Sequence, residues 1–102
     1  DGINLRAPAG APIRAAANGV VAYAGNAVEG FGNLVLLKHD GGWVTAYAHA
    51  EDLLVIRGDT VRQGDPIARV GKTGSVDEPQ LHFEIRQGKK PVDPLPLLPG
   101  VG

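Results

Sequence analysis

The chain has 102 residues, 43% of them hydrophobic, and a net formal charge of −1. That length accommodates a single domain with a modest core, which we assign to residues 1–102. The balanced charge argues against nucleic-acid binding, the lack of cysteine excludes disulfides, and no run of about 18 apolar residues is present to span a membrane. Because the chain starts at Asp1 rather than Met, we expect it to be an excised C-terminal part of a longer protein.

Glycine and proline divide the chain into short segments rich in Val, Ile, Leu and Tyr, a pattern typical of short strands and tight turns. No window keeps a helical period, apart from a possible turn at Glu51–Leu54. The sequence therefore predicts an all-β domain of short antiparallel strands. The expected strands, in chain order, are Gly19–Gly25, Leu34–His39, Trp43–His49, Pro66–Val70 and Gln80–Arg86.

The segment Asp40–Gly42 lies between the second and third of these strands. Its glycines can adopt the positive φ angles of a tight hairpin, so we expect residues 34–39 and 43–49 to pair antiparallel. His39, at the start of this turn, is expected to be solvated or to cap the turn. Because side chains alternate along a strand, Tyr47 and His49 should project from the same face.

Alternation also divides the strand 80–86. Its apolar residues should point into a core, and Gln80, His82 and Glu84 should share the opposite face. If this polar face meets that of His49, the three side chains His49, Gln80 and His82 converge in a central groove. Separately, the segment 58–71 looks like half of a biotinyl or lipoyl hammerhead, but it has no lysine at a hairpin tip, so shared strand geometry explains the likeness.

Two motifs resemble the LytM or lysostaphin-type zinc endopeptidases. Residues 47–49 read Tyr-Ala-His, which matches the family's Tyr-x-His, and residues 80–83 read Gln-Leu-His-Phe, which matches its His-x-His-Phe with Gln80 in place of the first histidine. The family's His-x-x-x-Asp motif would end at Asn4, and its histidine would fall one residue before Asp1. Further segments at 7–13, 17–21, 30–35, 71–74 and 90–94 occur in the family's order, so the resemblance covers nearly the whole chain.

The resemblance implies a fold that contains a hammerhead-like half, of the kind called a duplicated hybrid motif. It also has consequences for the chemistry of the site. In the family, the residues that match Asn4 and His82 hold zinc, and the one that matches Gln80 assists the attacking water. An amide is a poor zinc donor and cannot transfer a proton near neutral pH. We therefore expect no bound metal, no cofactor, no catalytic residue and no enzymatic activity.

The segment 2–4 and the strand ending at Arg86 are most similar to a degenerate LytM branch of amidase activators, the branch of EnvC, NlpD and DipM. Membership would imply a periplasmic location at the division site. It would also imply activation of an N-acetylmuramoyl-L-alanine amidase, which splits septal peptidoglycan so that daughter cells separate. Two alternatives are a weak zinc-dependent peptidoglycan endopeptidase and a passive peptidoglycan-binding module. The expected partner-binding residues are Asn4, Phe31, Tyr47, His49, Gln80, His82 and Arg86.

Overall fold

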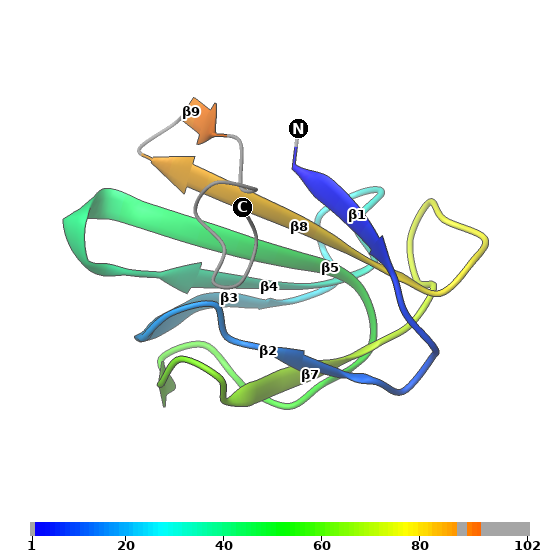
Figure 1. Cartoon of the computed structure of the whole chain (residues 1–102), viewed down its shortest axis with the longest axis horizontal. Helices are drawn as coiled ribbons and strands as arrows, with labels where there is room; N and C mark the ends of the chain where they lie inside the picture. The colour runs from blue at the N-terminus through cyan, green and yellow to red at the C-terminus, as the bar shows by residue number, and fades with distance from the viewer. Residues whose placement is uncertain (1, 88–89, 93–102) are drawn as a thin grey trace.

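The computed structural model describes residues 2–87 and 90–92. It confirms the predicted all-β class: strands account for the regular structure of these residues apart from one 3-10 turn, η1 (Figure 1). No helix in this part of the chain has the length and apolarity needed to cross a membrane. The elements are β1 (Ile3–Arg6), β2 (Pro12–Arg14), β3 (Gly19–Gly25), β4 (Asn33–Lys38), η1 (Asp40–Gly42), β5 (Trp43–Leu53), β6 (Thr60–Val61), β7 (Pro66–Val70), β8 (Gln80–Gln87) and β9 (Lys90–Val92).

All strand pairs are antiparallel, and the main sheet has the order β1-β8-β5-β4-β3-β6. The central strand β5 pairs with β4 and β8 along its first part and with β7 near its end. Strand β7 in turn pairs with β2, and these two strands lie below the main sheet in Figure 1. The long, bent β5 therefore connects the two layers.

All five predicted strands are present, with ends within a few residues of those expected. The predicted hairpin is also confirmed, because η1 joins the antiparallel pair β4 and β5, with Gly41 at φ 79° and Gly42 at φ 80°. The predicted helical turn at Glu51–Leu54 is wrong: β5 continues through Leu53, which pairs with β7. The unpredicted strands β1, β2, β6 and β9 have two to four residues each, too few to show a period.

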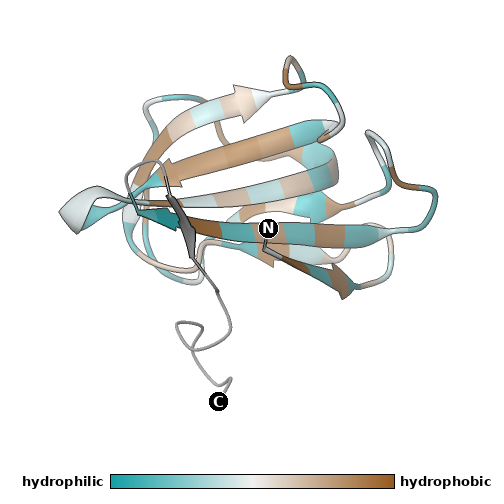
Figure 2. Cartoon of the chain, turned by 90° about the horizontal axis from the view of Figure 1, so that it is seen from above, coloured by the Kyte–Doolittle hydropathy of each residue, from teal (hydrophilic) through white to brown (hydrophobic). Residues whose placement is uncertain are grey.

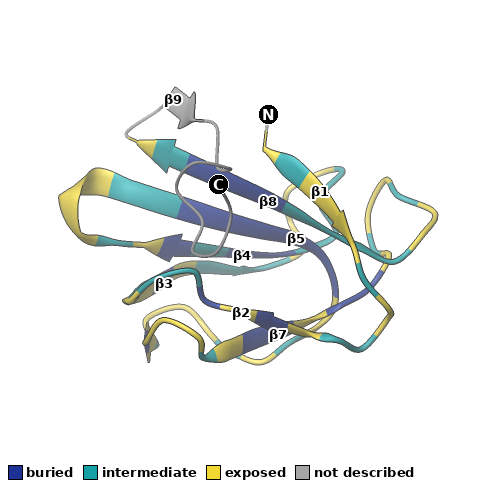
Figure 3. Ribbon diagram, viewed as in Figure 1, coloured by how far each residue is buried: buried dark blue, intermediate teal, exposed yellow. Residues whose placement is uncertain are grey.

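The main hydrophobic core lies between the sheet and the β2–β7 layer. Along β8, hydrophobic and polar residues alternate (Figure 2), and Phe83 and Ile85 are 3% and 6% exposed in this core. Figure 3 shows the buried middle of β5 and β8. The expected division of β8 into an apolar core face and a polar face is confirmed.

The His39 side chain is held by other residues, so it is neither left to solvent nor used to cap the turn, and both expected roles are wrong. Its Nδ1 lies 2.6 Å from the Asn18 carbonyl oxygen and its Nε2 lies 2.7 Å from Thr45 Oγ1. Thr45 Oγ1 is in turn 2.8 Å from the hydroxyl of Tyr47. The ring therefore links the end of β4 to the buried side of β5.

Candidate functional site

An open cavity of about 320 Å³, which we call the groove, lies where β1, β5 and β8 meet two loops, 26–32 and 72–79. It brings together five of the seven expected site residues, while Tyr47 and Arg86 do not line it. Three larger hollows, of about 580, 430 and 570 Å³, open elsewhere, and none of them is lined by His49 or His82. The groove is lined by Asn4, Glu29, Gly30, Phe31, His49, Ser75, Val76, Gln80 and His82.

His82 is held from both sides. The register of β1 against β8 pairs Asn4 with His82, and the Asn4 Oδ1 atom lies 2.6 Å from His82 Nδ1. The other ring nitrogen, Nε2, lies 2.7 Å from Glu84 Oε2. Because an ionised carboxylate only accepts hydrogen bonds, Nε2 is the donor to Glu84. Neither nitrogen of the ring is left without a partner.

Glu84 does not line the groove, but it holds His82 in place, and sequence reasoning did not select it. It is 5% exposed, and its Oε1 accepts hydrogen bonds from Arg86 Nε at 2.9 Å and Nη2 at 2.7 Å. Burial raises the pKa of the Glu84 carboxyl, but the hydrogen bonds and charges of His82 and Arg86 outweigh it, so the pKa lies below its ordinary value. The signal was a carboxylate two residues from both a histidine and an arginine on one strand face.

His49 has an unusual backbone conformation. Its φ angle is 71°, in the left-handed region that residues other than glycine rarely adopt. Two hydrogen bonds hold it there: the His49 N–H donates to the Phe31 carbonyl at 2.9 Å, and Nδ1 donates to the Thr73 carbonyl at 2.8 Å. The His49 and His82 ring centroids are 6.2 Å apart, so both rings face the groove.

Tyr47 lies in the core, and the expectation that it shares a face with His49 is wrong. It is 1% exposed, its ring centroid is 5.3 Å from that of Phe83, and its hydroxyl accepts the Ala16 N–H at 3.0 Å. Burial raises the pKa of Tyr47, against the opposing hydrogen bonds of Thr45 and Ala16. The left-handed φ of His49 breaks the strand alternation, so the two side chains project from opposite faces.

Phe31 lies on the loop 26–32, which is hydrogen-bonded to the loop 72–79 across the groove. Its ring centroid is 6.0 Å from that of His82. The preceding residue, Gly30, accepts hydrogen bonds at its carbonyl from Ser75 Oγ at 2.9 Å and from Ser75 N–H at 3.0 Å. At Gly32, where φ is 63°, an added Cβ would lie 2.4 Å from the Thr73 backbone. The close approach of the two loops therefore requires glycine at this position.

Gln80 forms part of the wall, and its Nε2 donates to the Glu78 carbonyl at 3.2 Å. The surrounding residues do not fit a zinc ion, which needs about three imidazole, thiolate or carboxylate ligands. Position 4 offers a neutral amide, and both ring nitrogens of His82 are already engaged. Within residues 2–87 and 90–92, no three His, Cys, Asp or Glu side chains are grouped to hold a metal.

The antiparallel sheet, with two histidines facing one groove, defines a domain of the LytM or lysostaphin type. The catalytic domain of the antimicrobial peptidase lysostaphin from Staphylococcus simulans has a TM-score of 0.90 and 30% sequence identity to this chain, covering 94% of it and 76% of the lysostaphin domain. Residues 1–94 match Peptidase family M23, and the chain belongs to that family.

Two relatives carry names that bear on function. The cell division protein DipM of Caulobacter vibrioides is 53% identical over 97% of this chain and 17% of its own length. The murein hydrolase activator NlpD of Escherichia coli is 45% identical over 96% of this chain and 26% of its own length. The chain thus spans only a minor part of these relatives.

Proposed function

We propose that this domain is a non-catalytic activator of a periplasmic N-acetylmuramoyl-L-alanine amidase that acts in septal peptidoglycan hydrolysis and daughter-cell separation. The names of two relatives, a murein hydrolase activator and a cell division protein, support an activator of cell-wall hydrolysis. The choice of an amidase as partner, and of the division site as location, follows from the degenerate LytM branch that the sequence resembles.

The observation that carries this proposal is that both ring nitrogens of His82 are in contact with other side chains. In a hydrolytic metal site, an imidazole must present a lone pair to the ion. Here Nε2 faces the carboxylate of Glu84 and Nδ1 faces the amide of Asn4. Gln80 cannot accept and return a proton as an imidazole does. The groove therefore keeps its shape without a set of groups suited to hydrolysis.

Such a groove can act by binding a partner. Phe31 and the apolar side chains beneath it form a surface against which a helix or loop of the amidase can pack. The partner's equilibrium shifts only if the groove prefers its active state over its inhibited state. Activation thus requires a segment of the amidase that is accessible in the active state and hidden in the inhibited one.

Dye release from labelled peptidoglycan tests the proposal, with the domain alone, a cell-wall amidase alone and the two together. We expect release above the amidase's own level only in the mixture. Zinc-dependent release by the domain alone would instead identify an endopeptidase. Binding to peptidoglycan without any effect on the amidase would identify a passive binding module.

A variant connects activation to the groove. Phe31→Ala removes the rim aromatic and should raise the domain concentration needed for half-maximal activation about tenfold, since buried aromatic anchors contribute about 1–2 kcal/mol or more. Ile56→Ala is the control, because Ile56 is 71% exposed and does not line the groove. Equal activation curves for both variants would exclude Phe31 from the partner contact.

A further inference from the structure

Two basic side chains lie on the same sheet face as His82, beyond the groove. Cross-strand register pairs Lys38 with Val44, and Val44 with Arg86. Directly paired residues of antiparallel strands project from the same face, and Arg86 shares the face of His82 by alternation along β8. Neighbouring strands are about 4.8 Å apart, so the backbones of Lys38 and Arg86, on either side of Val44, are about 10 Å apart. We call this group the basic end.

An apolar floor connects the basic end to the groove. It forms a separate hydrophobic cluster on the side of the sheet opposite the main core, and Phe31 belongs both to it and to the groove. One row nearer the groove than Val44, Ala46 pairs with Leu36 and with Glu84. The floor consists of the buried Leu34, Ala46 and Ala48 and the partly buried Tyr23, Phe31 and Leu36.

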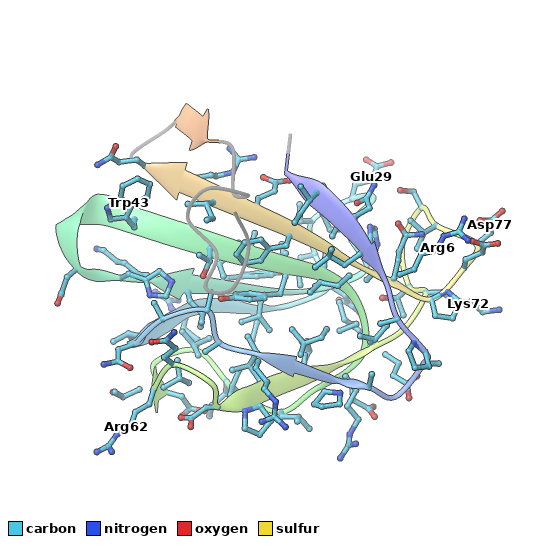
Figure 4. The ribbon with its side chains drawn as sticks, in the orientation of Figure 1. Arg6, Glu29, Trp43, Arg62, Lys72 and Asp77 are labelled. Atoms are coloured by element: carbon cyan, nitrogen blue, oxygen red, sulfur yellow. The ribbon has the colours of Figure 1, made fainter. Side chains whose placement is uncertain are left out.

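The charges of this face are unevenly distributed. Glu84 is matched by Arg86 and His82, whereas Lys38 is exposed and forms no ion pair within the described part of the chain. At the opposite end, Glu29 lines the groove. Figure 4 shows Glu29 and Trp43 at opposite ends of the sheet. Trp43 is the first residue of β5 and precedes Val44 of the basic end.

From this arrangement we propose that the face binds a protein segment that is apolar in its middle and carries a carboxylate at one end, which lies between Lys38 and Arg86. Glu29 repels that carboxylate from the other end and so sets the direction of the segment along the face. The apolar floor favours a protein segment over a peptidoglycan stem peptide, whose side chains are methyl groups or charged groups and offer little apolar surface. The inference rests on the proposed function only in naming the amidase as the source of the segment.

The experiment measures the affinity of the domain for two fluorescent amphipathic peptides of about 15 residues by anisotropy at low salt. The peptides are identical except that one carries two glutamates at one end and the other carries two lysines there. We expect the acidic peptide to bind about fivefold more tightly or better, the effect of one exposed ion pair. Equal affinity, or tighter binding of the basic peptide, would overturn the proposal.

Charge reversal locates the contact. Lys38→Glu should weaken binding of the acidic peptide about fivefold or more and improve binding of the basic one, while leaving the fold intact because the side chain is exposed. Lys72→Glu makes the same change of charge on an exposed loop residue at the other end and should leave the preference unchanged. Equal loss in the two variants would mean a general charge effect and would overturn the site. Arg86 is left intact because it holds Glu84.

Two further readouts separate this inference from the proposed function. A stem tetrapeptide of peptidoglycan should not displace the acidic peptide, and displacement at similar concentrations would overturn the choice of a protein segment. With a cell-wall amidase, Lys38→Glu should raise the half-maximal concentration for activation and leave the maximum unchanged. If the wild-type domain activates no amidase while the peptide preference and its reversal hold, the proposed function fails and the docking surface stands.

Discussion

Replacing Glu84 by glutamine should cost the domain about 3 kcal/mol of stability. The carboxylate is 5% exposed and accepts charge-assisted hydrogen bonds from His82 at 2.7 Å and from Arg86 at 2.9 and 2.7 Å. Removing one partner of a buried ion pair costs about 3–5 kcal/mol. The lower value applies here because the Arg86 side chain is 38% exposed and water can solvate its freed charge. The melting temperature should fall by about 12 °C or more.

The loss should depend on pH with a definite sign. The pKa of Glu84 is lower in the folded protein than its ordinary value of 4.5. The stability contributed by the ionised group is therefore present above the unfolded pKa and is lost as the pH falls through the folded pKa. Glutamine does not titrate, so the difference between wild type and Glu84→Gln is full at neutral pH and shrinks below about pH 4.

Urea unfolding followed by circular dichroism, at neutral pH and at about pH 3.5, measures both effects. Glu51→Gln is the control, because Glu51 is exposed, and it should stay within about 0.5 kcal/mol of wild type. A Glu84→Gln variant as stable as wild type would refute the argument that this carboxylate stabilises the fold. An equal loss at both pH values would show that the effect comes from packing rather than from charge.

Other changes test the core and the rim. Tyr47→Phe removes the buried hydroxyl that bonds to Thr45 and accepts the Ala16 N–H, and it should cost about 1–3 kcal/mol by urea unfolding. Unchanged stability would contradict the role of these bonds. Gly32→Ala combines a left-handed φ with a Cβ 2.4 Å from the opposite loop, whereas Gly10→Ala has the φ penalty and open space. Gly32→Ala should therefore lose more than the roughly 1–2 kcal/mol expected of Gly10→Ala, and equal losses in calorimetry would contradict the tight loop contact.

The sequence was sufficient to predict the elements that follow simple rules. In β8, strict alternation separates Phe83 and Ile85 from His82 and Arg86, because a strand buried on one face must alternate. The hairpin at η1 followed from two adjacent glycines. The motif match then placed His49 and His82 near one another, although they lie on different strands, and the rings are 6.2 Å apart.

Alternation failed where tertiary bonds override local preference. At His49, the hydrogen bonds to Phe31 and Thr73 come from two loops distant in sequence, and together they hold a φ angle that the residue alone would avoid. No local sequence pattern predicts such a conformation, so the sequence wrongly predicts that Tyr47 lies on the groove side. Glu84 was missed for a related reason. Its importance depends on its burial, and a glutamate is normally expected to be exposed.

The row of side chains along β8 also explains how a hydrolase-like groove can keep its shape through contacts of the protein alone. In metal sites, a carboxylate that binds the second ring nitrogen orients the histidine toward the ion. Here Glu84 fills that orienting role at Nε2, Arg86 fixes Glu84, and the atom facing Nδ1 belongs to the Asn4 amide. Because the protein itself supplies every one of these contacts, the ring stays in the groove whether or not an ion is bound. The shape of the groove is therefore weak evidence for hydrolysis. The side chain at position 4, an amide rather than a carboxylate, is the feature that distinguishes a binding groove from a metal centre.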